Sequence, residues 1–261
     1  MIKKTIAAGI VALGALTGTS SQAANIDLAF IMDSSGSVGS TNYNNAMDSL
    51  AAALSSYIPV GGANTYRIGV ISFASSARVD VFRTISTAQD LTDVVNAVDN
   101  ASFIGNNTDY EEAFDLVRTT FGSLGDSSIV NMMTDGEPCC VSTANADAVS
   151  ARNDLKAAGW DSLSFESIGS GADNTFLASL GFDTNGDGAT IIGDAGLITN
   201  PLDDAFVLQV SGFGSAYDSA IQRKVQKIVD PDPIPVPAAL PLLAGGLAIF
   251  GFVGRRRRQA A

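Results

Sequence analysis

Short apolar runs alternate with longer amphipathic stretches through the middle of this chain. The runs have the length of buried strands. They predict strands at residues 26–32, 66–73, 79–84, 129–133, 163–168 and 206–210. The stretches between them repeat apolar residues at helical spacing, which marks the buried face of a helix. The predicted helical faces are Tyr43, Met47, Leu50, Leu54 and Tyr57; Leu91, Val94, Val95 and Val98; Ala113, Phe114, Val117 and Phe121; and Tyr217, Ile221, Val225 and Ile228.

This alternation predicts an α/β fold with a doubly wound, mostly parallel central sheet that is flanked by helices. We expect residues 25–228 to form one domain, since about 205 residues suit a single hydrophobic core. In an open parallel sheet, ligands bind beyond the carboxyl ends of the strands, where the winding direction reverses. A functional site is therefore expected where the predicted strands end.

The segment after the first apolar run carries three oxygen-bearing side chains on one turn. Asp33, Ser35 and Ser37 alternate along the sequence, so an extended-to-turn backbone can aim all three the same way. Gly36 between them permits a positive φ or the close approach of another segment. One carboxylate and two hydroxyls suit a hard cation such as Mg²⁺ or Mn²⁺.

Two later residues complete this pattern. Thr108 opens a helical stretch, and Asp135 follows a second apolar run. With them in place, about residues 25–228 resemble the von Willebrand factor A family, whose metal-ion-dependent adhesion site is written DxSxS, then Thr, then Asp. The resemblance implies the Rossmann-like fold of that family.

The same resemblance implies a role for each residue of the set. The two serines and the threonine of the family motif touch the metal directly or nearly so, and its two aspartates act mostly through water. The implied metal residues are Asp33, Ser35, Ser37, Thr108 and Asp135. We expect both aspartates to lie at strand ends outside the packed core. A DxSxS segment by itself is equally explained by an ordinary polar turn, so the interpretation depends on all three parts.

A second segment has the spacing of a calcium loop. Oxygen ligands at positions 1, 3, 5 and 12, with glycine at position 6, are typical of the EF-hand type. The matching residues are Asp183, Asn185, Asp187 and Asp194, with Gly188 at position 6. Position 12 is Asp instead of Glu, and no obvious helix follows. An ordinary polar surface turn explains the segment as well, so Ca²⁺ binding here is one of two hypotheses.

Cys139 and Cys140 are the only cysteines, and they follow Asp135 closely. In an oxidising compartment they could form a vicinal disulfide that stiffens the loop beside the metal. Two free thiols, or bonds to another chain, are the alternatives.

The chain has no histidine, which removes the usual general base and the commonest zinc ligand. No Gly-rich phosphate loop is present, and Ser35 and Ser37 have no evident activating base. The sequence therefore predicts a protein that is not an enzyme.

Both ends of the chain have the composition of export signals. Residues 1–24 combine two lysines, an apolar stretch and a small-residue exit, which predicts a secretory signal peptide cleaved near Ala23. The alternative, a membrane-anchoring helix, needs about 20 apolar residues, more than this stretch offers.

At the other end, a Pro-rich linker at residues 229–237 precedes an apolar segment at residues 238–261 that ends in an arginine cluster. The linker resembles the VPLPA variant of bacterial PEP-CTERM sorting tails, matched by Ile234-Pro235-Val236-Pro237-Ala238. That resemblance implies transient membrane insertion and processing by an exosortase. A permanent C-terminal anchor is the alternative.

The charge balance is acidic, with 27 acidic and 15 basic residues and a net charge of −12. Such a field disfavours nucleic acid and anionic lipid as partners and attracts cations. We expect a secreted or cell-surface binding module of a bacterium, membrane-anchored before processing, whose metal bridges to an acidic side chain of a partner. The alternative is a structural component of an extracellular matrix or biofilm that uses metal for stability only.

Overall fold

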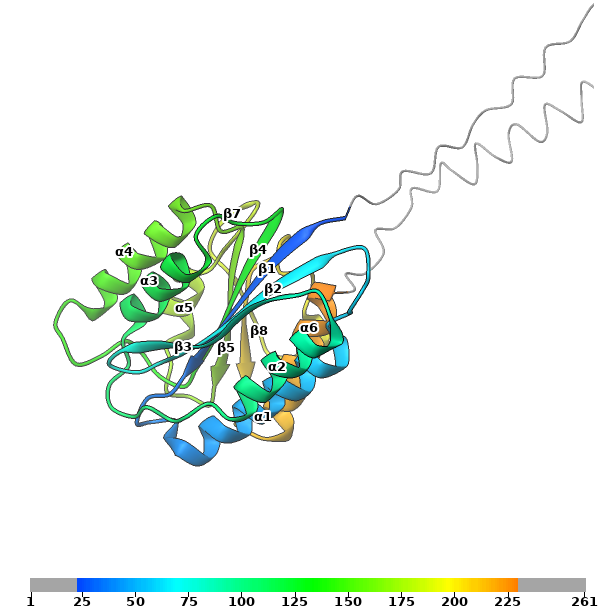
Figure 1. The fold of residues 1–261 in the computed structure, drawn as a ribbon. Coiled ribbons are helices and arrows are strands. Elements are labelled where there is room, and N and C mark those ends of the chain that lie inside the picture. Colours follow the sequence, from blue (N-terminus) through cyan, green and yellow to red (C-terminus); the bar gives the residue numbers. More distant parts are fainter. Residues whose placement is uncertain (1–22, 230–261) are drawn as a thin grey trace, which may run out of the picture.

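A nine-stranded sheet forms the middle layer of the molecule, and helices cover both of its faces (Figure 1). The computed structural model describes residues 23–229. Residues 1–22 of the predicted signal peptide (residues 1–24) and, apart from Val229, the predicted linker and C-terminal segment (residues 229–261) lie outside the described residues. Within the described part, no helix is both long and apolar enough to cross a bilayer.

The long strands are those that the apolar pattern predicts. They are β1 (Asn25–Asp33), β2 (Thr65–Phe73), β3 (Ala77–Ile85), β4 (Ser127–Thr134), β5 (Ser162–Ile168) and β9 (Phe206–Val210). Strand β1 pairs in parallel with β2 and β4, and β5 pairs in parallel with β4 and β9. The edge strand β3 is antiparallel to β2. The sheet is therefore mostly parallel, and the predicted fold class is confirmed.

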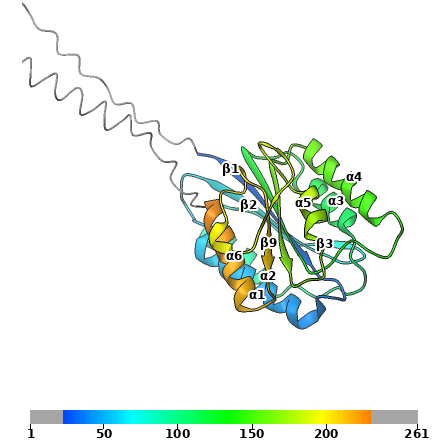
Figure 2. The same cartoon turned by 180° about the vertical axis from the view of Figure 1, so that it is seen from behind.

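Two layers of helices pack on the sheet. One face carries α1 (Gly39–Tyr57), α2 (Ala88–Asp99) and α6 (Ser215–Val229), and the other carries α3 (Tyr110–Phe121), α4 (Ala144–Ala157) and α5 (Asn174–Leu180). Figure 2 shows the same division from behind. The predicted helical faces do form core, although Tyr57, Leu91 and Val95 are only partly buried.

The hydrophobic pattern missed the smaller elements. These are α4, α5, the strands β6 (Phe182–Asp183), β7 (Gly186–Asp187) and β8 (Thr190–Ile192), and the 3₁₀ helix η1 (Ala195–Leu197). Most of them lie in the connection between β5 and β9, on the side of the sheet away from β2 and β3.

The connections around β1 create the expected opening at one edge of the sheet. The chain passes from β1 through α1 to β2 on one side, and it later reaches β4 on the other side through α3 on the opposite face. Met32 of β1 lies beside Met133 of β4, so the two strands end next to each other. Loops that follow these ends meet where the winding direction reverses.

Candidate metal site

Asp33 is the last residue of β1, and its side chain is completely buried. Its Oδ1 atom accepts a hydrogen bond from the backbone N–H of Ser35 at 2.8 Å, and its Oδ2 atom accepts one from the hydroxyl of Thr134 at 2.6 Å. Burial raises the pKa of Asp33 to about 6, against the opposing effect of these hydrogen bonds. The expectation that Asp33 lies outside the packed core is wrong, because the side chain is fully buried, with the Ser35 backbone on one oxygen and Thr134 of β4 on the other.

A chain of oxygen atoms leads from this buried carboxylate to the end of β4. The hydroxyls of Ser35 and Ser37 lie 3.0 Å apart, and the Ser37 hydroxyl donates to Oδ1 of Asp135 at 2.8 Å. Ser35 is buried, Asp135 is half-buried and Ser37 is exposed. Burial raises the pKa of Asp135, while the hydrogen bond from Ser37 opposes that shift. The structure thus brings together the two ends of the predicted motif, and the chain of oxygens opens to solvent at Ser37.

The loop that contains Thr108 packs directly against the DxSxS turn. Gly36 N–H donates to the carbonyl of Asn106 at 2.8 Å, and Gly105 N–H donates to the carbonyl of Ser34 at 2.8 Å. A Cβ atom on Gly36 would lie 3.2 Å from that Asn106 carbonyl oxygen, so the close approach favours glycine. Two backbone hydrogen bonds therefore hold this loop at the end of β1.

Thr108 is buried, and its carbonyl accepts a hydrogen bond from Cys139 N–H at 3.0 Å. The helix expected to open at Thr108 begins instead at Tyr110, with Asp109 as its N-cap. The Asp109 carboxylate accepts from the backbone N–H groups of Glu111 and Glu112, which is the usual role of an N-cap side chain. Thr108 thus lies in the turn before α3, between the loops that follow β1 and β4.

Sequence reasoning missed two residues that support the site from within. The hydroxyl of Tyr110 donates to the carbonyl of Gly136 at 2.6 Å and lies 3.2 Å from Thr134 Oγ1. Burial raises the pKa of Tyr110, so this hydroxyl keeps its proton. The sequence does contain a signal for Thr134, because it is a polar residue at the end of an apolar run. Nothing in the sequence relates Tyr110 to the loop after β4.

The donor set fits a hard divalent cation. Within residues 23–229, neither Asp33 nor Asp135 forms an ion pair, so no protein cation neutralises the two carboxylates. The same residues contain no group of three or more His, Cys, Asp or Glu side chains placed to hold a metal, which leaves hydroxyls as necessary partners. Carboxylate and hydroxyl oxygens suit Mg²⁺ or Mn²⁺ better than they suit soft metals.

The structure joins Cys139 and Cys140 in a disulfide. Both residues are exposed, and Cys140 has a positive φ of 81°. Since Cys139 N–H also donates to Thr108, the bonded pair lies next to the loop that completes the site.

The calcium-loop residues point to different partners. Asp183 accepts from the backbone N–H groups of Asn185 at 2.7 Å and Ala205 at 2.9 Å, and Asp194 accepts from Gly196 N–H at 2.7 Å. Asn185 donates to the carbonyl of Asp203 at 2.6 Å.

Asp187 pairs with Lys156 at 2.7 Å and with Arg152. These two cations lower the pKa of Asp187 to about 2. Calcium binding stays a prediction, and it would have to displace these cations.

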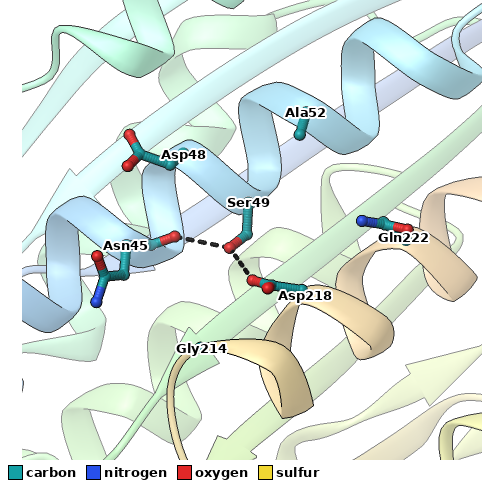
Figure 3. Close-up of a pocket in the computed structure, with 7 residues that line it drawn as sticks. All are labelled: Asn45, Asp48, Ser49, Ala52, Gly214, Asp218 and Gln222. Carbon is teal, nitrogen blue, oxygen red and sulfur yellow. Dashed lines mark hydrogen bonds between the residues drawn. The ribbon is translucent and has the colours of Figure 1, made fainter.

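A separate pocket of about 430 Å³ lies between α1 and α6, with Gly214 of the loop after β9 in its lining (Figure 3). Ser49 donates to the carbonyl of Asn45 at 2.7 Å and also contacts the carboxylate of Asp218, which ties the two helices together. The residues that line the pocket are Asn45, Asp48, Ser49, Ala52, Gly214, Asp218 and Gln222. None of the predicted site residues lines this pocket.

A family model, the von Willebrand factor type A domain, matches residues 27–196. Among curated proteins, no sequence matches the chain significantly.

Many solved structures share its fold, among them the following three. Proximal thread matrix protein 1 from the mussel byssus, in a form with a zinc-occupied metal-ion-dependent adhesion site, is 18% identical with a TM-score of 0.56 and covers 80% of this chain and 48% of its own. For a von Willebrand factor type A protein from Catenulispora acidiphila, the identity is 14%, the TM-score 0.52 and the coverage 78% and 42%. The pilus adhesin SpaC from Lactobacillus rhamnosus GG is 11% identical with a TM-score of 0.55, and the match covers 80% of this chain and 31% of SpaC. The chain therefore spans less than half the length of each of these structures.

Proposed function

This chain belongs to the von Willebrand factor type A domain family, and we propose that it is a metal-dependent adhesion module of the cell surface or extracellular space. In this proposal, Ser35, Ser37 and Thr108 hold a divalent cation, and Asp33 and Asp135 act mostly through water. When bound, Mg²⁺ or Mn²⁺ supplies an electrophilic centre with a position left for a carboxylate oxygen of a partner.

The observation that carries this proposal is the chain of oxygens from Ser35 through Ser37 to Asp135, which spans the ends of two adjacent strands. Three of the five proposed metal residues, Ser35, Ser37 and Thr108, offer hydroxyls, and two offer carboxylates. A cation held mainly by neutral oxygens keeps most of its positive charge, and it therefore attracts an acidic side chain from outside.

Residues in and around the site orient it and leave one side of it open. The hydrogen bonds from Thr134 and from the Ser35 backbone fix the orientation of the Asp33 carboxylate. The exposed Ser37 hydroxyl marks the side from which a partner approaches. The proposed function is binding without catalysis, because the site combines cation ligands with an open side for a partner and the chain has no histidine to activate Ser35 or Ser37 as a nucleophile.

The structural neighbours support two versions of this function. One neighbour is a pilus adhesin, and another is a thread matrix protein. The second candidate is accordingly a structural component of an extracellular matrix or biofilm in which the metal only stabilises the domain. We further propose export through the N-terminal signal and exosortase-type processing of the C-terminal tail.

Metal binding is tested by titrating Mg²⁺ into metal-free protein by calorimetry. Ser37→Ala and Asp135→Asn should weaken binding at least tenfold. The exposed Ser56→Ala on α1 is the matched control and should bind Mg²⁺ as the wild type does. Equal Mg²⁺ affinity in all four proteins would refute the metal site.

Adhesion is tested by capture of proteins from surface extracts of the producing cell, in Mg²⁺ and in EDTA. We expect capture in Mg²⁺ only, and loss of capture when carboxylates of the extract are methyl-esterified. Mg²⁺ binding with no metal-dependent capture would favour the structural role.

A further inference from the structure

Three polar side chains lie together in the apolar layer between the sheet and α6. Lys224 of α6 and Glu166 of β5 are 0% exposed, and Asn131 of β4 is 1% exposed. Lys224 Nζ lies 3.1 Å from Glu166 Oε1, and Asn131 Nδ2 donates to Glu166 Oε2 at 2.7 Å. One carboxylate therefore contacts both an amine and a carboxamide. The three residues lie away from the strand ends and take no part in the metal site.

The surroundings of this trio are mainly apolar, although the hydroxyl of the buried Tyr217 lies nearby and has no hydrogen-bond partner among the described residues. The ring of Phe206 lies 4.6 Å from Lys224 Nζ, and Phe30 is the neighbour of Asn131 across β1 and β4. Asn131 Oδ1 has no hydrogen-bond partner among the described residues, although it is buried. A buried ion pair is often less stabilising than apolar residues of the same volume, so stability alone explains this trio poorly.

We propose that the side chains of Lys224 and Asn131 join in a covalent amide bond, with Glu166 as the acid–base group. An unpaired carbonyl oxygen, an amine and one carboxyl group that touches both partners are the components of such a condensation.

Burial favours the reactive protonation states. It lowers the pKa of Lys224 and raises that of Glu166. A proton that passes from the ammonium to the carboxylate leaves a neutral nucleophilic amine and a carboxylic acid in a low-dielectric environment.

The reaction balances without an oxidant or any other reagent. The Lys224 amine forms a bond to Cγ of Asn131, and the Glu166 acid donates its proton to Nδ2, the Asn131 atom that it contacts. Glu166 then takes a proton from the attacking nitrogen. The Cγ–Nδ2 bond breaks, ammonia leaves, and Glu166 ends protonated, as it began.

The bond would connect the centre of β4 to the last helix of the domain. Asp135 of the metal site directly follows β4, and α6 is the final described element before the C-terminal segment. A pull between a bound partner and the C-terminus would then pass from β4 to α6 through a covalent bond. Loop closure in the unfolded state would also raise the melting temperature.

Peptide mass spectrometry of the full chain tests the proposal. In unmodified protein, trypsin releases residues 119–152 as one peptide and cleaves after Lys224. We expect instead residues 119–152 bonded to residues 224–227, with a mass lower by one ammonia than the two peptides together. Glu166→Gln and Lys224→Arg should each give the two parts unjoined, whereas the matched control Lys227→Arg should retain the bond.

The wild-type protein decides the outcome, so a variant that fails to fold leaves the test intact. Recovery of unmodified residues 119–152 and cleavage after Lys224 from folded wild type would overturn the proposal. Ammonia loss confined to residues 119–152, with no joined peptide, would indicate a succinimide at Asn131 and would overturn it too.

Discussion

At the scale of single residues, the metal site depends on a carboxylate that is buried from bulk solvent in the metal-free fold. Asp33 receives one backbone and one hydroxyl hydrogen bond, and no positive charge compensates it within the described residues. An ionised carboxylate in that position is unfavourable until a cation arrives. Asp33 is therefore both a weak point of the metal-free fold and a source of metal affinity.

The first prediction concerns Thr134, whose hydroxyl donates to Asp33 Oδ2. Thr134→Val keeps the shape but leaves that buried oxygen without a donor, which costs about 1–3 kcal/mol when the carboxylate is charged. We expect weaker Mg²⁺ binding by calorimetry, although Thr134 is not among the proposed ligands. Thr119→Val on the exposed face of α3 is the control. An unchanged Kd for Thr134→Val would show that this hydrogen bond does not matter for the metal.

The second prediction is a pH dependence of metal-free stability. The pKa of Asp33 rises from 3.8 to about 6 on folding, so the folded state binds the proton more tightly. This contribution to stability is fully present below the unfolded pKa and is lost as pH rises through about 6. It amounts to about 3 kcal/mol between the two limits.

Asp33→Asn cannot titrate at this position. Denaturant unfolding in metal-free buffer should therefore show the wild type losing stability relative to Asp33→Asn between about pH 4 and pH 7. Parallel pH profiles for the two proteins would contradict the assigned shift. Added Mg²⁺ should restore the wild type at pH 7 and leave the variant little changed.

At the scale of elements, the sequence predicts well where burial is strong and periodic. The predicted strands match β1, β2, β4, β5 and β9 to within two residues at each end, because each is a short segment in which apolar residues predominate. The hydrophobic pattern did not predict helix α4, because its buried face contains only one large apolar residue. That face is formed by Ala148, Ala151, Arg152 and Leu155. Strands β6, β7 and β8 are two or three residues long, which is too short to show an alternation of apolar and polar residues.

Some features of the candidate site could likewise be predicted from the sequence, and others could not. The order of Asp33, Ser35, Ser37, Thr108 and Asp135 follows from a spaced motif, which a sequence displays directly. The support from Tyr110 and Thr134 depends on hydrogen bonds between elements that are distant in sequence, which only the folded chain specifies. The burial of Asp33 could not be predicted either, because it depends on how β4, about 100 residues further along the chain, packs beside β1.

The third prediction concerns the hairpin of β6 and β7. Asp187 in this hairpin is held by Lys156 and Arg152 of α4. Calcium must compete with both cations for this carboxylate, so Lys156→Met should bind Ca²⁺ more tightly than the wild type does. Calorimetry with Ca²⁺ measures this, and Asp183→Asn in the Lys156→Met background should abolish the gain. No Ca²⁺ binding by either the wild type or Lys156→Met would refute the calcium loop and leave an ordinary polar turn.

At the scale of the whole molecule, the candidate site and the two ends of the described chain lie at opposite edges. The parallel strands end at the edge that carries Asp33 and Asp135, and β9 ends there too. Helix α6 then runs back, so its C-terminal end lies on the same side of the molecule as the start of β1 (Figure 1). A module attached through its C-terminal segment would thus present its metal site away from the attachment point. Its acidic charge of −12 would favour cations over anionic surfaces at that exposed edge.

The last prediction concerns the C-terminal tail and its distance from the metal site. If the tail is a sorting signal, protein recovered from the producing cell should end within residues 236–238 and lack the arginines at 255–258, which intact-mass and C-terminal peptide measurements decide. Because Val229 leaves the domain at the edge opposite Asp135, loss of the tail should not alter the Kd for Mg²⁺. A full-length chain in the membrane fraction would indicate a permanent anchor instead. Weaker Mg²⁺ binding after tail removal would contradict the separation of the two edges.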